Sequence, residues 1–355
     1  MLRCSERSLR LHALGWVARC RPFLPGRGKL PRCNDKRFDW NHSMPPPQFT
    51  GVIPILATPF NEDESLDLVS WRRMIEFMVE LGVDGITILG VLGESNRLND
   101  FEREALVKVA VETVNKRIPV IVGASHSGTA AAGFLARMAE DLSADAVMIA
   151  PAREAVPNDQ RVLEYYQRIA AASKLPIVLQ DHPASTEVHM PVELILRIVK
   201  EVASVACIKA EAVPTPPKIR ALRAGLAEMT RPVSILSGLG ALYAPFDLAA
   251  GSDGFNTGFA FPEVLRALLN AAHADDMERV HTLYARFATL IVFEQQPGLA
   301  VRKEILRQRG LIASNRVRHP GATITPAVAA DVAALIARTL PGIDITQAIT
   351  RAIEP

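Results

Sequence analysis

The sequence predicts an α/β fold, a (β/α)8 TIM barrel followed by a C-terminal helical extension. From residue 51 onward, eight short apolar runs alternate with amphipathic stretches of helical period, and most of the runs are rich in β-branched residues. Such runs are typical of parallel strands that are buried on both faces. Eight strands that alternate with helices over about 210 residues favour a closed barrel over an open sheet.

The elements follow one another in a regular order. The predicted strands cover residues 52–57, 85–89, 119–123, 146–150, 176–179, 205–209, 233–237 and 254–256. Helical periodicity between them is clearest over residues 67–81, 100–115, 129–142, 159–173 and 191–202. It continues without a further strand over 277–293, 300–309 and 326–338. We therefore expect an extension over 1–48, a barrel over 49–275 and a helical appendage over 276–355.

Composition excludes several classes of protein. The chain is 49% apolar and 22% charged, and its formal net charge of +2 predicts a soluble globular protein with no nucleic-acid partner. It has no uncharged apolar stretch long enough for a membrane span. Residues 1–48 are rich in arginine and poor in acidic residues, as organellar transit peptides are. We favour the alternative that translation starts at Met44, because no amphipathic helix is evident, and we expect a cytoplasmic protein.

Lys209 ends the apolar run Val205-Ala206-Cys207-Ile208, so the sequence places a lysine in a buried strand. Burial disfavours the ammonium form, which lowers the pKa of a lysine and leaves a neutral amine that can attack a ketone. We interpret Lys209 as a Schiff-base nucleophile. The residues alone leave open a structural lysine neutralised by Glu211, which lies two residues on and on the same strand face.

Other candidate residues follow the predicted strands, where the active site of such a barrel forms. After the second strand, two glycines in a GxxGE turn allow the backbone to point amide groups at one spot, as a carboxylate cradle requires. The candidates for substrate binding are Gly90, Val91, Leu92, Gly93, Glu94, Arg153, Ser237 and Gly238.

Taken jointly, these motifs resemble the dihydrodipicolinate synthase/N-acetylneuraminate lyase superfamily of Schiff-base-forming barrels from about residue 51 to 340. The matching segments are Gly51-Val52-Ile53-Pro54, Thr58-Pro59-Phe60, Gly90–Glu94, Pro119-Val120-Ile121-Val122-Gly123, Ile208-Lys209 and Ser237-Gly238. The resemblance implies that Lys209 forms an imine with a small-molecule 2-oxo acid and that the Gly90–Glu94 loop holds its carboxylate. It also implies a homo-oligomer, dimer or tetramer. We expect no cofactor and no metal.

The sequence departs from the family pattern at the positions of the residues that transfer protons in the family. The family's tyrosine at the end of strand five is replaced in Gln180-Asp181-His182-Pro183, and an amide does not exchange protons usefully. Val91 and Leu92 replace the threonines of the glycine loop, and Ala152-Arg153 replaces a tyrosine pair after strand four. The segment from Gln180 and the segment over residues 312–320 are instead similar to 2-keto-3-deoxy-L-arabonate dehydratases.

Candidate proton-transfer groups therefore differ from those of the synthases. His182 is the nearest group of suitable pKa, although a histidine at a loop start is often only hydrogen-bonded at the surface. Glu211 is either the ion partner of Lys209 or a base. The catalytic candidates are thus Lys209, His182, Glu211 and Gln180. Arg153 either reaches the substrate or stays solvated, and Glu94 is expected to tie down its own loop.

Two hypotheses follow. The first is an imine-forming lyase that dehydrates a 2-keto-3-deoxy sugar acid, with a pyruvate-dependent aldolase or a dihydrodipicolinate synthase-like enzyme as the alternative. The second is a barrel that has lost turnover and only binds 2-oxo acids. The lysine and the glycine loop favour the enzyme, because a binding protein has little need of a buried amine.

Overall fold

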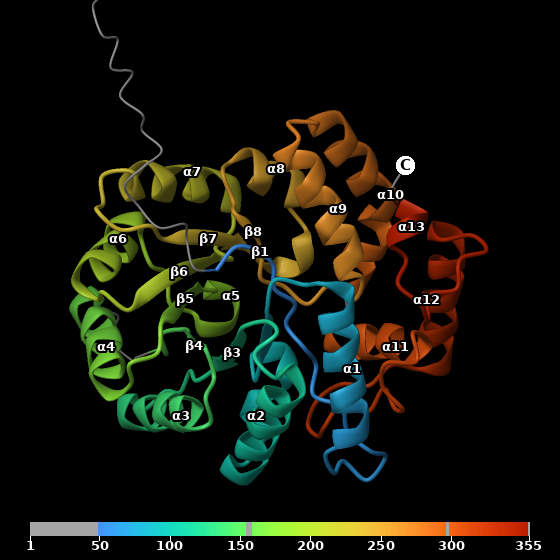
Figure 1. Cartoon of the computed structure of the whole chain (residues 1–355), viewed down its shortest axis with the longest axis horizontal. Coiled ribbons are helices and arrows are strands. Elements are labelled where there is room, and N and C mark those ends of the chain that lie inside the picture. The colour runs from blue at the N-terminus through green and yellow to red at the C-terminus, as the bar shows by residue number, and fades with distance from the viewer. Residues whose placement is uncertain (1–48, 154–157, 296–297, 354–355) are drawn as a thin grey trace, which may run out of the picture. The chain divides into compact units, whose positions relative to one another are not determined.

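The computed structural model describes residues 49–153, 158–295 and 298–353 of the chain. Within these ranges, eight strands form one parallel sheet in the order β1-β8-β7-β6-β5-β4-β3-β2, with helices around it (Figure 1). The two ends of this order meet through a parallel bridge between Ile55 and Thr87, where the Thr87 amide donates to the Pro54 carbonyl at 2.8 Å. The sheet is therefore curled into a TIM-barrel-like arrangement.

The strands and helices alternate along the chain. The strands are β1 (Gly51–Val52), β2 (Ile86–Ile88), β3 (Val120–Gly123), β4 (Ala146–Ile149), β5 (Ile177–Asp181), β6 (Val205–Ala210), β7 (Ser234–Ser237) and β8 (Gly254–Phe255). The helices are α1 (Leu68–Leu81), α2 (Asp100–Val114), α3 (Thr129–Asp141), α4 (Asp159–Ala172), α5 (Pro183–Thr186), α6 (Val192–Glu201), α7 (Thr215–Leu226), α8 (Ala244–Ala249), α9 (Pro262–His273), α10 (Met277–Glu294), α11 (Leu299–Gln308), α12 (Pro326–Thr339) and α13 (Thr350–Ile353).

The predicted helices agree with these bounds to within one residue, and seven of the strands agree to within two. The first strand is wrong in extent, because only Gly51–Val52 is regular where residues 52–57 were expected. Pro54 has no amide hydrogen, so it interrupts the ladder, although Ile55 still donates to the Thr257 carbonyl at 2.9 Å. The extension predicted over residues 1–48 lies outside the described residues.

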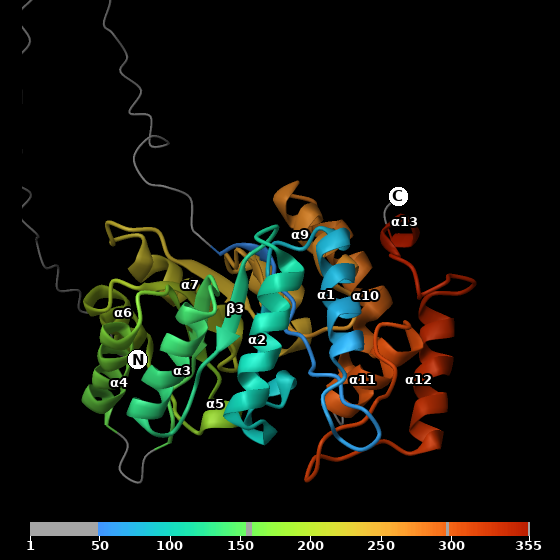
Figure 2. The same cartoon turned by 60° about the horizontal axis from the view of Figure 1, so that its bottom comes forward.

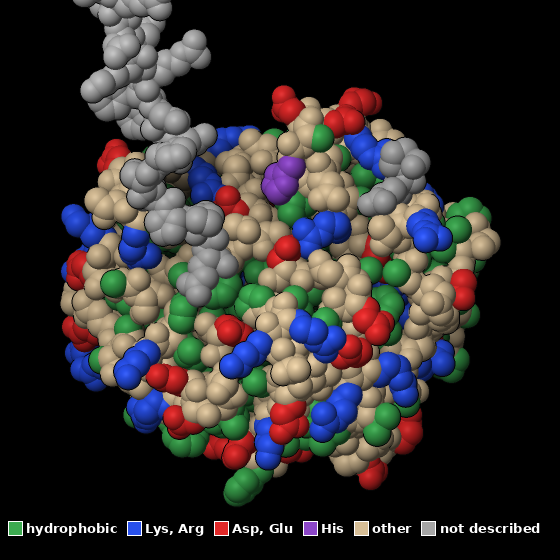
Figure 3. Space-filling model, in the orientation of Figure 1, with side chains coloured by type: hydrophobic (Ala, Val, Ile, Leu, Met, Phe, Trp, Pro, Cys, Tyr) green, Lys and Arg blue, Asp and Glu red, His purple; other side chains and the backbone are tan. Residues whose placement is uncertain are grey.

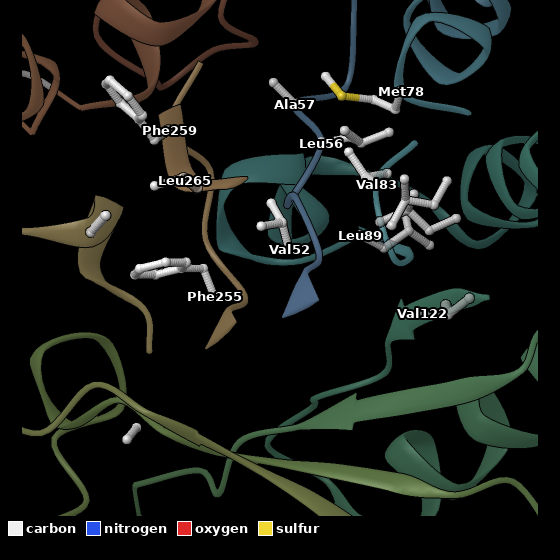
Figure 4. Close-up of a cluster of buried hydrophobic side chains, with 14 of the residues drawn as sticks. Val52, Leu56, Ala57, Met78, Val83, Leu89, Val122, Phe255, Phe259 and Leu265 are labelled. Atoms are coloured by element: carbon white, nitrogen blue, oxygen red, sulfur yellow. The ribbon is translucent and has the colours of Figure 1, made fainter. Parts of the chain in front are cut away.

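The core has two parts that the sheet separates. Side chains inside the barrel form a small cluster with Cys207, Val178, Ile121 and Met148 among its members. A larger cluster fills the space between the strands and the surrounding helices, and Figure 4 shows part of it around Val52 of β1 and Phe255 of β8. Strand residues alternate between the two clusters, so a residue two positions after Cys207 again points into the barrel.

Helices α10 to α13 form a group next to α9 and α1 (Figures 1 and 2), in which α10 and α13 contact α9, and α12 contacts α10 and α11. Arg309, which follows α11, forms a fully buried ion pair with Glu263 of α9 at 2.6 Å. The Ala313 amide also donates to the Ser70 hydroxyl of α1 at 3.0 Å. These contacts hold the C-terminal helices against the barrel and bring α11 close to the carboxyl end of β2.

The face of the molecule in Figure 3 shows no large patch of one charge sign among the described residues. Basic and acidic side chains are interspersed over the face in Figure 3, in keeping with the nearly balanced net charge. Every helix within the described ranges is too short or too polar to cross a bilayer.

Candidate active site

Lys209 lies on β6 two residues after Cys207 and therefore faces the barrel interior. It is 1% exposed, and its Nζ is 3.1 Å from Oε2 of Glu211. Burial lowers the pKa of Lys209 below its ordinary value, the Glu211 carboxylate opposes this shift, and the Arg302 guanidinium adds to it. The site thus favours a neutral amine at a lower pH than a solvated lysine would allow.

Glu211 is held by three neighbours. Gln180, whose register partner on β6 is Lys209, donates from Nε2 to Glu211 Oε2 at 2.8 Å, and the Leu239 amide donates to Oε1 at 3.2 Å. Burial raises the pKa of Glu211, but the charges of Lys209 and His182 and these hydrogen bonds outweigh burial, so the pKa is lowered. The side chain is therefore a carboxylate at neutral pH, placed beside the amine.

Gly238 makes this placement possible. A Cβ atom at residue 238 would lie 2.3 Å from Cγ of Glu211, a distance that no real packing tolerates. The glycine predicted to bind substrate at the end of strand seven therefore provides space for Glu211.

His182 is the N-cap residue just before α5 and is half-buried. Its Nδ1 lies 2.6 Å from the Ser185 hydroxyl. Burial lowers its pKa, while Glu211 raises it and Lys209 lowers it further, so all three groups share one electrostatic environment. His182 is thus near the amine and the carboxylate, but it forms no hydrogen bond with either among the described contacts.

The first two residues of the Gly90–Glu94 loop line a cavity of about 560 Å³. The cavity is lined by Gly90, Val91, Ser125, Met148, Arg153 and Gln180, among others. The loop turns through Val91–Gly93, and within the described part of the chain the amides of Val91 and Leu92 have no acceptor. A larger cavity of about 760 Å³ along α4 includes none of Lys209, Glu211 and Gln180. Lys209 and Glu211 do not line the smaller cavity either, but Gln180 does, and its side chain donates to the Glu211 carboxylate beside the amine. We therefore place the site at the smaller cavity.

Two of the predicted binding residues, Glu94 and Ser237, point away from this cavity, and a third, Arg153, is paired with another side chain at its edge. Glu94 is fully buried and is bound by Lys303 of α11, by Arg97 and by the Arg318 amide. The Ser237 hydroxyl is also fully buried, and it donates to Asp247 of α8. Arg153 is exposed at the cavity mouth and pairs with Glu187.

Sequence reasoning missed the contribution of α11. Arg302 is 3% exposed, pairs with Glu294 at the end of α10, and packs against Gly258 just after β8. The available signal was a run of charged residues, Arg302-Lys303-Glu304, within a helix expected to be amphipathic. Charges at successive positions cover more than one face of a helix, so some of them must be buried.

A model of the dihydrodipicolinate synthetase family matches residues 48–339. The chain belongs to this family. Family membership confirms the resemblance inferred from the motifs and, at that level, the prediction of a Schiff-base-forming lyase that acts on 2-oxo acids.

Relatives within the dihydrodipicolinate synthetase family carry two kinds of name. The chain is 34% identical to an L-2-keto-3-deoxyarabonate dehydratase of Azospirillum brasilense, over 83% of this chain and 96% of that protein. It is 30% identical to a 4-hydroxy-tetrahydrodipicolinate synthase of Chlorobium chlorochromatii, over 77% of this chain and 91% of that protein. Among solved structures, a dihydrodipicolinate synthase from Rhodopseudomonas palustris has a TM-score of 0.79 at 36% identity, over 83% of this chain and 99% of that one.

Proposed function

We propose that this protein is a class I hydro-lyase that removes water from a 2-keto-3-deoxy sugar acid through an imine at Lys209. The observation that carries the proposal is the Lys209–Glu211–Gln180 cluster. It places a carboxylate 3.1 Å from the reactive nitrogen, with an amide where the synthases of the family carry their tyrosine. The similarity to a dehydratase over most of the chain supports the same reaction.

The reaction begins with the neutral Lys209 amine, which attacks the C2 ketone and releases water as the imine forms. The imine draws electrons from C3 and makes its protons acidic. C3 is bonded to the imine carbon, so a base that contacts Nζ is also within reach of a C3 proton. Glu211 takes that proton and leaves an enamine. Gln180 does not titrate; its amide holds the Glu211 carboxylate in place.

The enamine then expels the C4 hydroxyl, which needs a proton to leave as water. That proton comes from Glu211, which has just gained one, or from His182. Hydrolysis of the resulting unsaturated imine restores Lys209 and releases a 2-oxo acid with a C3=C4 double bond and a C5 hydroxyl. This acid becomes the semialdehyde when one proton moves from C5 to C3 and the hydroxyl proton moves to C4. One water is lost overall, with no oxidation or reduction, so the reaction needs no redox cofactor. The substrate carboxylate is held by the Gly90–Glu94 loop, through the amides of Val91 and Leu92.

The test is a comparison of products from one purified protein. With 2-keto-3-deoxypentonate, we expect a 2-oxo acid semialdehyde, and we expect the Lys209→Ala variant to form none. Release of pyruvate from the same substrate would identify a retro-aldol enzyme instead. Condensation of pyruvate with aspartate semialdehyde would identify a synthase. Imine trapping without any product would identify a barrel that only binds 2-oxo acids.

We also propose that the protein works as a cytoplasmic homo-oligomer whose barrel spans residues 49–275 and whose helical appendage spans 276–355. The family resemblance supports the homo-oligomer, and the contacts of Arg309 and Ala313, just after α11, with α9 and α1 support the packing of the appendage on the barrel. Light scattering of the purified protein tests the oligomeric state, and a mass larger than that of one chain is expected.

A further inference from the structure

Glu94, at the end of the glycine loop, is the meeting point of three donors. Lys303 Nζ binds its Oε1, while Arg97 Nη1 at 2.7 Å and the Arg318 amide at 3.0 Å bind its Oε2. Neither the Glu94 nor the Lys303 side chain has any exposed surface. Lys303 also donates to the Arg316 carbonyl at 2.7 Å. One carboxylate of the loop is thus fixed by α11 and by the segment that follows it.

The conformation of the Gly90–Glu94 loop depends on contacts with other parts of the chain. Glu94 has a φ of 54°, a left-handed conformation that is unfavourable for a residue with a side chain. The Thr58 hydroxyl holds the Gly93 carbonyl at 2.6 Å, and Leu92 packs near Gly258. Among these contacts, only those of Glu94 tie the loop to the C-terminal helices through a buried ion pair.

We propose that Glu94 and Lys303 form a positioning pair, through which α11 holds the Gly90–Glu94 loop in the conformation that receives the substrate carboxylate. This inference rests on the proposed function, because it takes the loop as the carboxylate site. It assigns the C-terminal helices a part in substrate affinity. Neither side chain touches the substrate.

The experiment measures how much pyruvate is needed to reach half-maximal borohydride trapping at Lys209. In the double variant Glu94→Gln/Lys303→Met both buried charges are removed together, so neither is left unpaired. We expect the half-saturating pyruvate concentration to rise about 10- to 100-fold, because the loop amides lose their alignment. The trapping rate at saturating pyruvate should stay near that of the unmodified protein, because Lys209 and Glu211 are unchanged.

The matched control removes another buried pair near the same helix. Glu263→Gln/Arg309→Met acts on α9 and the end of α11, where neither residue contacts the loop. It should lower the melting temperature without changing the half-saturating concentration. Should the first double variant not fold, Glu94→Asp carries the same expectation, because it keeps the charge and draws the carboxylate back from Lys303.

The outcomes separate the two proposals. An unchanged half-saturating concentration in the Glu94 variants, or an equal rise in the control, would overturn the positioning role. Failure of the unmodified protein to trap pyruvate at Lys209 would instead overturn the proposed function.

Discussion

Replacing Glu211 by Gln tests the assignment of the base while preserving the shape of the site. The glutamine carbonyl can still accept a hydrogen bond from Gln180 or from the Leu239 amide, so the side chain should keep its place. What disappears is the negative charge beside Lys209 and the ability to take a proton. Loss of the charge should favour imine formation at lower pH, whereas loss of the proton acceptor should slow dehydration.

Coulomb's law with an effective dielectric constant of about 20 gives an attraction of about 5 kcal/mol between unit charges 3.1 Å apart. This attraction favours the ammonium form of Lys209, against the effect of burial. Its removal lowers the pKa of Lys209 further, so more of the amine is neutral at a given pH. Pyruvate trapping in the Glu211→Gln variant should therefore extend to lower pH than in the unmodified protein. Dehydration should fall about 10²- to 10⁴-fold, the usual contribution of a general base.

The assay follows both steps in one preparation. Trapping at Lys209 is measured by mass spectrometry between about pH 5 and about pH 10, a range below the ordinary pKa of a lysine. Semialdehyde formation is measured at neutral pH. Glu304→Gln serves as the control, since Glu304 is a buried carboxylate of α11 that binds Arg307 and not Lys209. The reasoning fails if dehydration survives in Glu211→Gln. It also fails if trapping at neutral pH falls as steeply as dehydration, because Glu211 would then be only a structural partner of Lys209.

The sequence predicted the strand and helix positions because parallel strands buried on both faces leave uninterrupted apolar runs. The same regularity placed Lys209 and Glu211 on one face, since side chains on a strand alternate with a period of two. Gln180 meets them because β5 and β6 are neighbours in register, a pairing that a barrel topology predicts only approximately. Pro54 explains the one strand whose extent was wrong.

Contacts between distant segments escaped prediction for a physical reason. Glu94 and Lys303 are 209 positions apart, and their meeting depends on how α11 packs against the barrel. The hydrogen bond of the Ser237 hydroxyl escaped prediction for the same reason, because its acceptor Asp247 lies on a helix whose orientation no strand pattern specifies. Position at a strand end therefore identified the right edge of the sheet, but it did not show which side chains face the cavity.

Three further substitutions test single residues of the site. Ser237→Ala should lower the free energy of unfolding, measured in urea, by about 1–3 kcal/mol, because buried Asp247 loses a hydrogen-bond donor. It should leave KM unchanged, and a raised KM would show that Ser237 binds substrate. His182→Ala should lower dehydration about 10²-fold with trapping retained, and unchanged dehydration would leave both proton transfers to Glu211. Gly238→Ala is the most direct steric test. Its Cβ would lie 2.3 Å from Cγ and Oε1 of Glu211, so the carboxylate must move away from the space it now fills beside Lys209. Lys209 itself is untouched, so trapping should persist while dehydration falls about as far as in Glu211→Gln. Dehydration at the unmodified rate in a folded Gly238→Ala protein would show that the reaction does not depend on where that carboxylate lies.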